Sequence, residues 1–536
     1  MIVDPQSMKP DDATWVLTSS FVIFTMQTGF GLLESGCVSK MNEVNILMKN
    51  AVDVVLGGLT YWAVGYGLQN GRGPGTNPFC GVGSFFLDAS SEVMGEEFAM
   101  FIFQLSFATT ATTIVSGAMA ERTNFHAYMF FSALSTVMYC IPAGWVWSKH
   151  GFLNKLGVID FAGSACVHLL GGTSGLVSAI MLGPRLKWDR ARRPRMGNPT
   201  NAMIGAFTLW WGSLVFNSGS TFGISDEKWH FAARSAVSTI NSSIGGGLVG
   251  TIATYLVHRN FDVEEIITSI LGSLVSITAG SAFYRSWEAL LIGAIGGLCT
   301  TPIPSLLRRC FSVDDPVNAA AIHGVGGLWG MLAVGLFLDA TRYQGLRYHR
   351  RGLFKGGGFE LLGIQAVACL TIIVWSSGVT FIVLKLINKV TPLRMSPEDE
   401  LLGADFVEHG IEHRELCPYH HSPPPGDMLR VRNDTATTAE TNVADDHRPQ
   451  NEDKDNDDAP STEGASEDAG LPDGPPGTED PMAATGSASP EFHRGTSFWE
   501  VMNQETGNDG KMDDASPQQE MTIRLVANYR SNCVIA

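Results

Sequence analysis

Two histidines occupy matching sequence frames inside long apolar stretches of the chain. The frames are Asp160…His168…Gly171-Gly172 and Asp315…His323…Gly326-Gly327, with the same spacing in both. Imidazole both donates and accepts hydrogen bonds, and its charge changes near neutral pH. Burial favours the neutral ring, so two facing rings can share one proton and offer an N–H group or a lone pair. Such a pair suits a small neutral or transiently neutral solute, because a bare cation there would cost many kcal/mol.

Other interpretations of these residues stay open at this point. Asp160 and Asp315 could each be an N-cap, because helix starts favour aspartate. A single histidine inside a membrane often only bonds a neighbouring helix, although matching frames favour a pathway. A metal or haem pair is disfavoured because no Cys, Glu or further His stands at ligand spacing. No phosphate-binding loop, catalytic triad or metalloprotease motif occurs, so we expect no enzyme activity, cofactor or metal.

Transmembrane helices must hold these histidines. A helix that crosses the hydrocarbon core needs about 20 mostly apolar residues. Eleven segments qualify, with approximate bounds 14–37, 45–69, 97–120, 126–147, 161–182, 201–219, 231–257, 263–283, 286–304, 317–338 and 360–387. Their many Gly, Ala, Ser and Thr residues favour close packing in one bundle. The predicted fold class is an all-α polytopic membrane protein with eleven transmembrane helices and a disordered cytoplasmic tail.

The two histidines lie on the fifth and tenth spans. Because these spans are five apart, their helices run in opposite directions, which is the signature of a 5+5 inverted repeat. We expect Asp160 near the outer mouth and Asp315 near the inner one. Eight helical residues rise about 12 Å, and the midplane lies about 15 Å from either face. His168 and His323 should therefore meet near the middle of the membrane.

Basic residues set the expected orientation, because they prefer the cytoplasmic side. The loop after the fifth span is rich in them: Arg185, Lys187, Arg190, Arg192, Arg193 and Arg195. This loop predicts an outer N-terminus and a cytoplasmic C-terminus. The loop after the tenth span disagrees, since the same topology places it outside: Arg342, Arg347, Arg350, Arg351 and Lys355.

The net charge of −17 belongs to the tail. Residues 396–536 hold 30 of the 53 acidic and 9 of the 36 basic residues, which excludes an acidic surface on one large soluble domain. Residues 433–520 have too little apolar surface to bury to offset the entropy cost of folding. We predict a membrane domain at 1–395, a short cytoplasmic segment at 396–415 and an acidic, mostly disordered tail at 416–536. The nine cysteines form no CxxC pair, so neither a disulfide framework nor a zinc module is indicated.

Aromatic residues stand near the predicted outer mouth. Trp147 ends the fourth span, Phe107 and Phe216 lie in the third and sixth, and Ser220 is one turn beyond Phe216. A cation held against aromatic faces gains about 0.5–2 kcal/mol. For any one of these aromatics alone, membrane-interface or lipid packing is the commoner role.

The sequence resembles the ammonium transporter family (the Amt/Mep/Rh superfamily), in particular its Amt branch of eukaryotic type, over residues 12–412. The resemblance depends on several runs: Phe103-Gln104-Leu105-Ser106-Phe107, Gly117-Ala118-Met119-Ala120-Glu121-Arg122, Asp160-Phe161-Ala162-Gly163-Ser164, Val167-His168, Phe216-Asn217-Ser218-Gly219-Ser220, and Asp314-Asp315 before His323-Gly324-Val325. It implies a plasma-membrane homotrimer with one pore in each subunit. The implied partners are ammonium or ammonia, the bilayer and unidentified cytoplasmic partners of the tail, without nucleic acid.

The resemblance also implies residue roles. Trp147, Phe107 and Ser220 would form an outer ammonium-recruitment site, which Asp160 would support electrostatically without touching the cation. Phe107 and Phe216 would be a stacked gate beneath that site. A further implied feature is a twin-histidine pair of His168 and His323 in a hydrophobic lumen. Ammonium would lose its proton near the gate and pass the centre as ammonia.

This chain departs from the family pattern at three positions. Ser213 stands where related bacterial proteins often have Trp, and Asn318 where many members have Asp. Val407 replaces a Thr that plant members carry, so phosphorylation cannot occur there.

Two other functions and one modification remain alternatives. The chain could be an ammonium sensor that signals through its tail, or an Rh-like channel for ammonia or carbon dioxide. The final residues Cys533-Val534-Ile535-Ala536 match a farnesylation box, although nearby basic residues are few.

Overall fold

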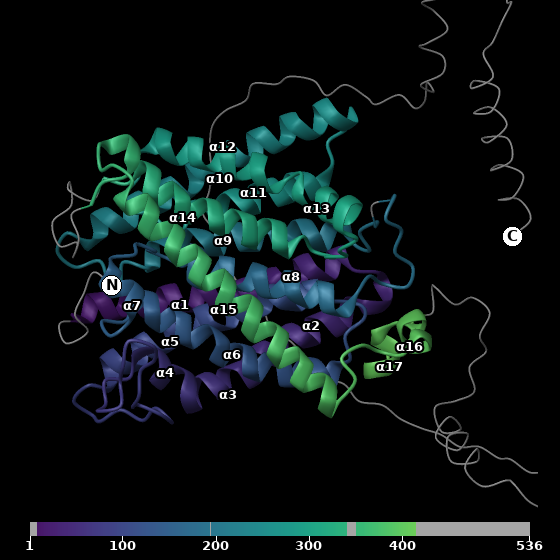
Figure 1. Cartoon of the computed structure of the whole chain (residues 1–536), viewed down its shortest axis with the longest axis horizontal. Coiled ribbons are helices and arrows are strands. Elements are labelled where there is room, and N and C mark those ends of the chain that lie inside the picture. The colour runs from purple at the N-terminus through teal and green to yellow at the C-terminus, as the bar shows by residue number, and fades with distance from the viewer. Residues whose placement is uncertain (1–7, 193, 340–349, 414–536) are drawn as a thin grey trace, which may run out of the picture. The chain divides into compact units, whose positions relative to one another are not determined.

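The computed structural model describes residues 8–192, 194–339 and 350–413, and these residues form a helical bundle without a β-strand (Figure 1). All of them lie in the first of two units of the chain, Met1–Arg430. The α-helices are α1 Pro10–Cys37, α2 Glu43–Val52, α3 Gly58–Thr60, α4 Tyr66–Asn70, α5 Met94–Ala118, α6 Phe125–Trp147, α7 Phe152–Leu156, α8 Leu170–Leu182, α9 Pro199–Gly219, α10 Lys228–His258, α11 Val263–Ile277, α12 Ser286–Thr300, α13 Ile303–Leu306, α14 Gly326–Phe337, α15 Glu360–Val390, α16 Pro397–Leu402 and α17 Ala404–His409.

Shorter helical segments join these helices or continue them. They are η2 Lys40–Asn42, η3 Asp53–Gly57, η4 Tyr61–Gly65, η5 Ser164–Leu169, η6 Leu307–Phe311, η7 Ala320–Val325 and η9 Leu353–Lys355. All but η2 and η9 are π-helical turns.

Within the described residues, nine helical segments are long and apolar enough to cross a membrane. They are Pro10–Cys37, Lys40–Asn70, Met94–Ala118, Phe125–Leu156, Ser164–Leu182, Lys228–His258, Ser286–Phe311, Ala320–Phe337 and Glu360–Val390. Two further predicted spans coincide with α9 and α11, which are not among the nine. The 15 residues of α11 rise only about 22 Å. The all-helical membrane architecture is therefore found, whereas the count of eleven stays a prediction.

Small residues bring the backbones of α1 and α9 into contact. A Cβ atom on Gly36 would lie 2.3 Å from the backbone nitrogen of Ala202, and one on Gly205 would lie 2.2 Å from that of Leu33. Neither position can accept a side chain without moving the partner helix. Helices associate in lipid through such close contacts, because lipid is itself apolar and the hydrophobic effect does not drive the helices together. In the predicted repeat, α1 and α9 begin the two halves.

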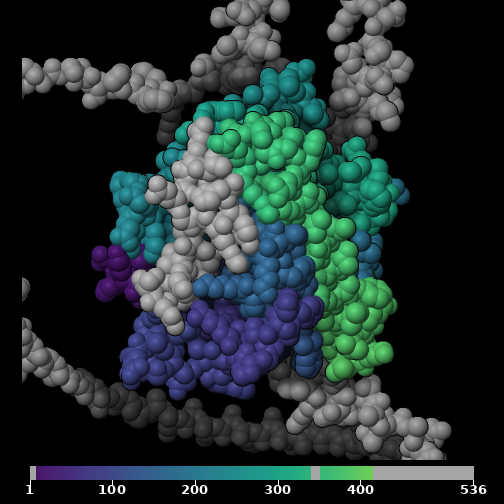
Figure 2. Space-filling view, turned by 60° about the vertical axis from the view of Figure 1, so that its left-hand side comes forward, coloured from purple at the N-terminus to yellow at the C-terminus, as the bar shows by residue number. Residues whose placement is uncertain are grey.

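The last long helix, α15, runs diagonally across the bundle in Figure 1 and forms a continuous green ridge in Figure 2. Its 31 residues extend about 46 Å, which exceeds a hydrocarbon core of about 30 Å and explains the tilt. Three side chains fasten it to α6 and α8. Trp375 donates to the carbonyl of Met138, while Ser376 and Thr380 bond α8 at its first and second turns.

The described residues after α15 lie against the start of α2. The buried carboxylate of Asp405 accepts backbone N–H groups from Val44 and Asn45 at 3.2 and 2.7 Å. Two unsatisfied donors at the helix start are thereby paired. The predicted tail at 416–536, with Cys533, lies outside the described residues, and the predicted domain boundaries stay predictions. The seven cysteines within the described residues are all free thiols.

Candidate functional site

Both histidines lie on π-helical turns, one on η5 and the other on η7. The backbone N–H of His168 donates to the carbonyl of Gly163 at 3.1 Å, five residues earlier. An α-helix then follows each turn, beginning at Leu170 after His168 and at Gly326 after His323. The matching sequence frames thus fold into matching local structures. Single π turns inside helices are rare and are found mostly at functional sites.

Asp160 caps the turn that carries His168. Its carboxylate accepts four backbone N–H groups, from Gly163, Ser164, Ala165 and Cys166, at 2.8–3.2 Å. The N-cap interpretation therefore holds for this residue. The carboxylate is buried and already has four donors, so it faces the chain itself rather than solvent. These four donors favour the ionised form of the carboxyl group.

Asp315 makes the corresponding contact at the second frame. Its Oδ2 accepts the backbone N–H of Ala320 at 2.8 Å. Its Oδ1 is buried without a hydrogen-bond partner among the described residues. Asp315 lines a small cavity of about 30 Å³ together with Cys37, Asn318 and Ala321. Ala321 belongs to η7, so this cavity borders the turn that carries the second histidine.

The two imidazoles face each other. Nδ1 of His168 lies 3.1 Å from Nδ1 of His323, a distance that fits one N–H···N hydrogen bond. The rings are nearly parallel at 13°, with centroids 5.3 Å apart. Both side chains are buried, at 5% and 8% exposure. One ring must donate and the other accept, so the pair has room for a single proton between its facing nitrogens.

Glycines after each histidine allow this approach. A Cβ atom on Gly172 would lie 2.1 Å from the backbone nitrogen of Gly324, the residue after His323. A Cβ atom on Gly327 would lie 2.7 Å from the backbone nitrogen of Leu169, the residue after His168. The contact is reciprocal, since the residue four positions after each histidine meets the residue directly after the other histidine. This is the pattern of contacts that the predicted inverted repeat would produce.

Aromatic rings continue the line of the histidines. Phe107 on α5 and Phe216 on α9 stack at 4.0 Å between centroids and 13° between planes. Trp147, the last residue of α6, packs its ring edge-to-face with Phe107 at 5.8 Å. Phe216 in turn lies 5.6 Å from the ring of His168. Four residues chosen from sequence therefore form one contiguous series.

Phe30 extends that series and was missed by sequence analysis. Its ring on α1 lies 5.9 Å from the ring of His323, and its side chain is buried. No spacing or motif singled it out, because an apolar aromatic in a membrane helix is unremarkable. Only the crossing of α1 with the second histidine turn gives it a place beside the site.

Ser220 begins the turn after α9, at the end of the helix that carries Phe216. Its hydroxyl donates to the carbonyl of Phe216 at 2.8 Å, and the side chain is buried. Ser213 lies one turn before Phe216 and bonds the carbonyl of Leu209 instead of presenting an aromatic ring. Asn318 uses its amide to bond Glu264 at 2.8 Å on the neighbouring α11.

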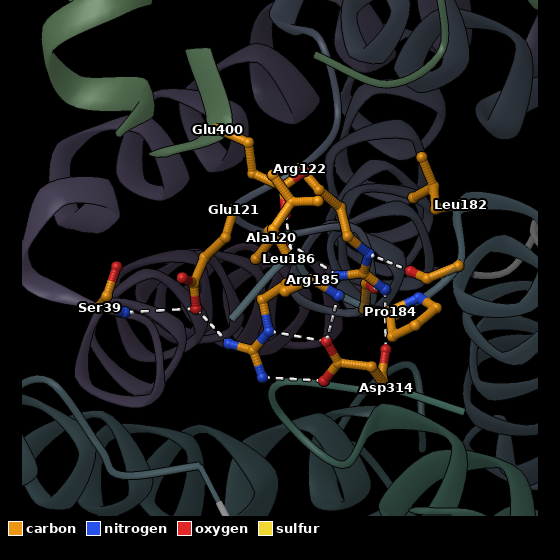
Figure 3. A network of polar contacts seen from close by, with 12 residues as sticks. Ser39, Ala120, Glu121, Arg122, Leu182, Pro184, Arg185, Leu186, Asp314 and Glu400 are labelled. Atoms are coloured by element: carbon orange, nitrogen blue, oxygen red, sulfur yellow. Dashed lines mark hydrogen bonds and ion pairs between the residues drawn. The ribbon is translucent and has the colours of Figure 1, made fainter. Parts of the chain in front are cut away.

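An ion-pair cluster joins Arg185 to Glu121 and Asp314 (Figure 3). Arg185 donates to Asp314 through Nε and Nη2, at 2.8 Å each, and pairs with Glu121. Burial acts to lower the pKa of Arg185, but Glu121 and Asp314 raise it above its ordinary value. Sequence analysis treated Arg185 only as a loop charge. It instead joins residues that follow α5, follow α8 and precede η7.

Arg122 supports the same cluster without a direct ion pair. It is fully buried and donates to carbonyl oxygens of Ala118, Ala120, Gly183 and Asp314 at 2.8–3.1 Å. These carbonyls would otherwise be unpaired helix ends. The ends of α5 and α8 are therefore fixed to the loop that leads to His323.

Comparison with known proteins identifies the family of the chain. The family model described as Ammonium Transporter Family matches residues 14–413. The chain belongs to the ammonium transporter family. Its described membrane helices and the relatives below make it a multi-pass membrane protein of a family of transporters, not an enzyme.

Curated ammonium transporters match the chain over most of the membrane region. Putative ammonium transporter 3 of Caenorhabditis elegans is 43% identical over 422 residues, which is 76% of this chain but only 61% of that protein. Ammonium transporter 1 member 3 of Solanum lycopersicum is 35% identical over 427 residues, covering 74% of this chain and 92% of the relative. The chain thus spans less than two thirds of the first of these proteins.

A solved structure described as a sensor Amt protein has the same fold. It is 30% identical, with a TM-score of 0.69, and the match covers 75% of this chain and 98% of that one. In this member of the ammonium transporter family, the residues predicted from sequence form one contiguous series from Trp147 to His323.

Proposed function

We propose that this chain conducts ammonium, as ammonia, through a pore lined by the series from Trp147 to the paired histidines. The observation that carries the proposal is the unbroken contact of Trp147, Phe107, Phe216, His168 and His323. Membership of the ammonium transporter family and the similarity to named ammonium transporters support the same substrate.

The outer end of this series recruits the cation. Trp147 and Phe107 offer aromatic faces and edges at 5.8 Å, where a cation gains about 0.5–2 kcal/mol. The indole N–H of Trp147 donates to the backbone carbonyl of Asp160 at 2.8 Å, which fixes the ring next to that residue. Asp160 attracts ammonium through its charge. Ser220, at the end of α9, supplies a polar group near the same mouth.

The stacked rings of Phe107 and Phe216 act as the gate. At 4.0 Å they leave no room for a solute between them, so one ring must turn aside. An ammonium ion that crosses this apolar layer would lose its water shell at a cost of many kcal/mol, whereas ammonia loses far less. Ammonium therefore gives up its proton near the gate.

The facing imidazoles carry ammonia through the middle. With one proton between their Nδ1 atoms, each neutral ring keeps a donor or an acceptor for ammonia. The reciprocal glycine contacts of Gly172 and Gly327 hold the rings at this spacing. We further propose eleven spans with a 5+5 inverted repeat, an outer N-terminus, a cytoplasmic C-terminus, and a homotrimer in the plasma membrane.

Uptake of labelled methylammonium into transport-deficient cells tests the proposal. Replacing both His168 and His323 by Ala should abolish or alter uptake, while the exposed His258→Ala control should leave it unchanged. Unchanged flux and selectivity in the double variant would remove the histidines from the mechanism. Conduction of ammonia or carbon dioxide without selection for ammonium would instead favour a gas channel.

A sensor is the second candidate, because the matched solved structure is described as a sensor Amt protein. The long acidic tail would then carry the signal. Truncation near residue 415 separates the two functions, since uptake should survive in a transporter and signalling output should disappear in a sensor.

A further inference from the structure

Three ionisable side chains are buried inside the membrane region outside the aromatic and histidine series. Glu34 lies on α1, Lys49 on α2, and Asp53 at the start of η3, with exposed fractions of 1%, 0% and 0%. Ionisable groups at such positions are costly and usually mark an ion or proton pathway. The proposed conduction mechanism uses none of them, so they need an explanation of their own.

Charge balance limits the state of this trio, because one amine faces two carboxyl groups. Tyr128 links the amine to one of them. Its hydroxyl donates to both oxygens of Asp53 at 2.7 and 2.9 Å, and Nζ of Lys49 lies 5.7 Å above the centroid of its ring. Glu408, Glu121 and Arg122 also act on Lys49, so the nearby carboxyl groups outnumber the cations, and ionising both Asp53 and Glu34 would leave unbalanced buried negative charge.

The contacts of Asp53 are those of an ionised carboxylate. Besides the Tyr128 hydroxyl, Oδ2 accepts from Thr113 at 3.1 Å. The Thr113 hydroxyl also lies 2.8 Å from Oε1 of Gln27, whose Nε2 has no partner among the described residues. Turning the Gln27 amide over, which coordinates alone do not exclude, lets Nε2 donate to Thr113 and leaves the Thr113 proton for Asp53. Asp53 then needs no proton.

The contacts of Glu34 fit a protonated carboxyl group. The Ser116 hydroxyl lies 2.8 and 2.7 Å from the two oxygens of Glu34 and 2.7 Å from the carbonyl of Thr113. All three neighbours are oxygens, but a hydroxyl has one proton to give. If Ser116 donates to the Thr113 carbonyl, Glu34 must be protonated and donate to Ser116. Asn50 then donates to the other oxygen of Glu34 at 2.7 Å.

Glu34 lies one helical turn from a residue that lines the Asp315 cavity. That residue is Cys37, further along α1. Gly117 packs between Glu34 and the loop before η7, since a Cβ atom on it would be 3.0 Å from Oε1 of Glu34 and 2.4 Å from Val317. The cavity is therefore the nearest described space with which Glu34 could exchange a proton.

We propose that Glu34 is a proton-binding site, distinct from the histidine pair, which holds a proton in the resting protein and exchanges it with the cavity beside Asp315. Asp53 and Lys49 form the compensating ion pair across Tyr128. The exchange moves one proton between the Glu34 carboxyl group and a water molecule, and no other bond changes.

Infrared difference spectra of the full chain in lipid vesicles test the site. Subtracting the spectrum of Glu34→Gln from that of the natural chain should give a carbonyl band of a protonated carboxyl group. Subtracting the spectrum of the matched variant Asp53→Asn should give bands of an ionised carboxylate. The reverse assignment, or no protonated band in the Glu34→Gln difference, would overturn the proposal.

Melting temperature supplies a second measurement should Asp53→Asn fold poorly. Gln has the shape of a neutral Glu and adds no charge, so Glu34→Gln should melt within a few degrees of the natural chain. Asp53→Asn leaves Lys49 without its counter-ion and should melt well below it. Equal, large losses in both variants would show that both groups are ionised, which contradicts the proposal.

Transfer of the vesicles to D₂O tests exchange with the cavity. The Glu34 band should shift to its deuterated position within the mixing time, because Cys37, one turn along α1 from Glu34, lines the cavity. Gly117→Ala, which fills the space between Glu34 and the loop before η7, should slow the shift. A band that stays unshifted for hours in the natural chain would exclude exchange.

Discussion

Gly172, four residues after His168, lies against Gly324, the residue that follows His323. Gly327, four residues after His323, lies against Leu169, the residue that follows His168. The same two positions of each frame therefore make the same contact with the other frame. Such reciprocity is what an approximate two-fold axis between oppositely directed helices produces. It explains why the frames share their spacing as well as their histidines.

Substitution of either glycine should damage the molecule to a similar degree. Gly172→Ala and Gly327→Ala place a methyl group 2.1–2.7 Å from backbone atoms that cannot turn aside. Overpacking of this kind costs about 1–3 kcal/mol, and it also pushes the imidazoles apart. We expect lower melting temperatures in detergent and loss of methylammonium uptake in both variants.

Gly363→Ala on α15 is the matched control, since a Cβ atom there meets nothing within 4 Å. It should be neutral or stabilising by up to about 1 kcal/mol. A large effect of only one of the two frame glycines would argue against the reciprocal arrangement.

Trp147→Leu should weaken recognition of the cation more than movement of ammonia. Loss of a cation–π contact of about 0.5–2 kcal/mol corresponds to a rise of about 2- to 30-fold in KM for ammonium. Uptake kinetics over a range of ammonium concentrations measure this change. Trp211→Leu, at a ring 56% exposed on α9, serves as the control. An unchanged KM with a collapsed maximal rate would place Trp147 outside recruitment.

Arg185→Gln should destabilise the protein strongly although the residue follows a helix in a basic loop. The change leaves Glu121 and Asp314 buried without their cation, and breaking a buried pair in this way costs about 3–5 kcal/mol. Arg192→Gln removes a charge whose side chain is 87% exposed and should change stability by less than about 0.5 kcal/mol. Equal melting temperatures for the two variants would show that the cluster contributes little.

The contribution of Asp314 to stability should vanish only in acid. Burial alone would raise the pKa of this carboxyl group, but Arg185 holds it below its ordinary value. A lowered folded-state pKa stabilises the protein above the unfolded value of about 3.9 and is lost as the pH falls through the folded value. The difference in melting temperature between the natural chain and Asp314→Asn should therefore be constant from about pH 8 to 5. A difference that already shrinks near pH 6 would assign the titration to another group.

Spacing predicted the positions of the site residues better than it predicted their surroundings. The frames of His168 and His323 were visible because chemistry-bearing residues repeated at a fixed interval, and the structure brings these residues together. Phe30 was invisible, because its position depends on how α1 crosses a helix nearly 300 residues later in the chain. Arg185 was treated only as a loop charge for a related reason, since its burial beside a distant Asp314 leaves no local pattern.

The four backbone donors around Asp160 leave its carboxylate no freedom to follow a ligand. Its influence on an arriving ion is then that of a stationary field, equal for ions of equal charge at equal distance. Discrimination between ammonium and an alkali ion of similar radius cannot originate in this aspartate. It has to arise where the ion contacts the aromatic rings and can release a proton.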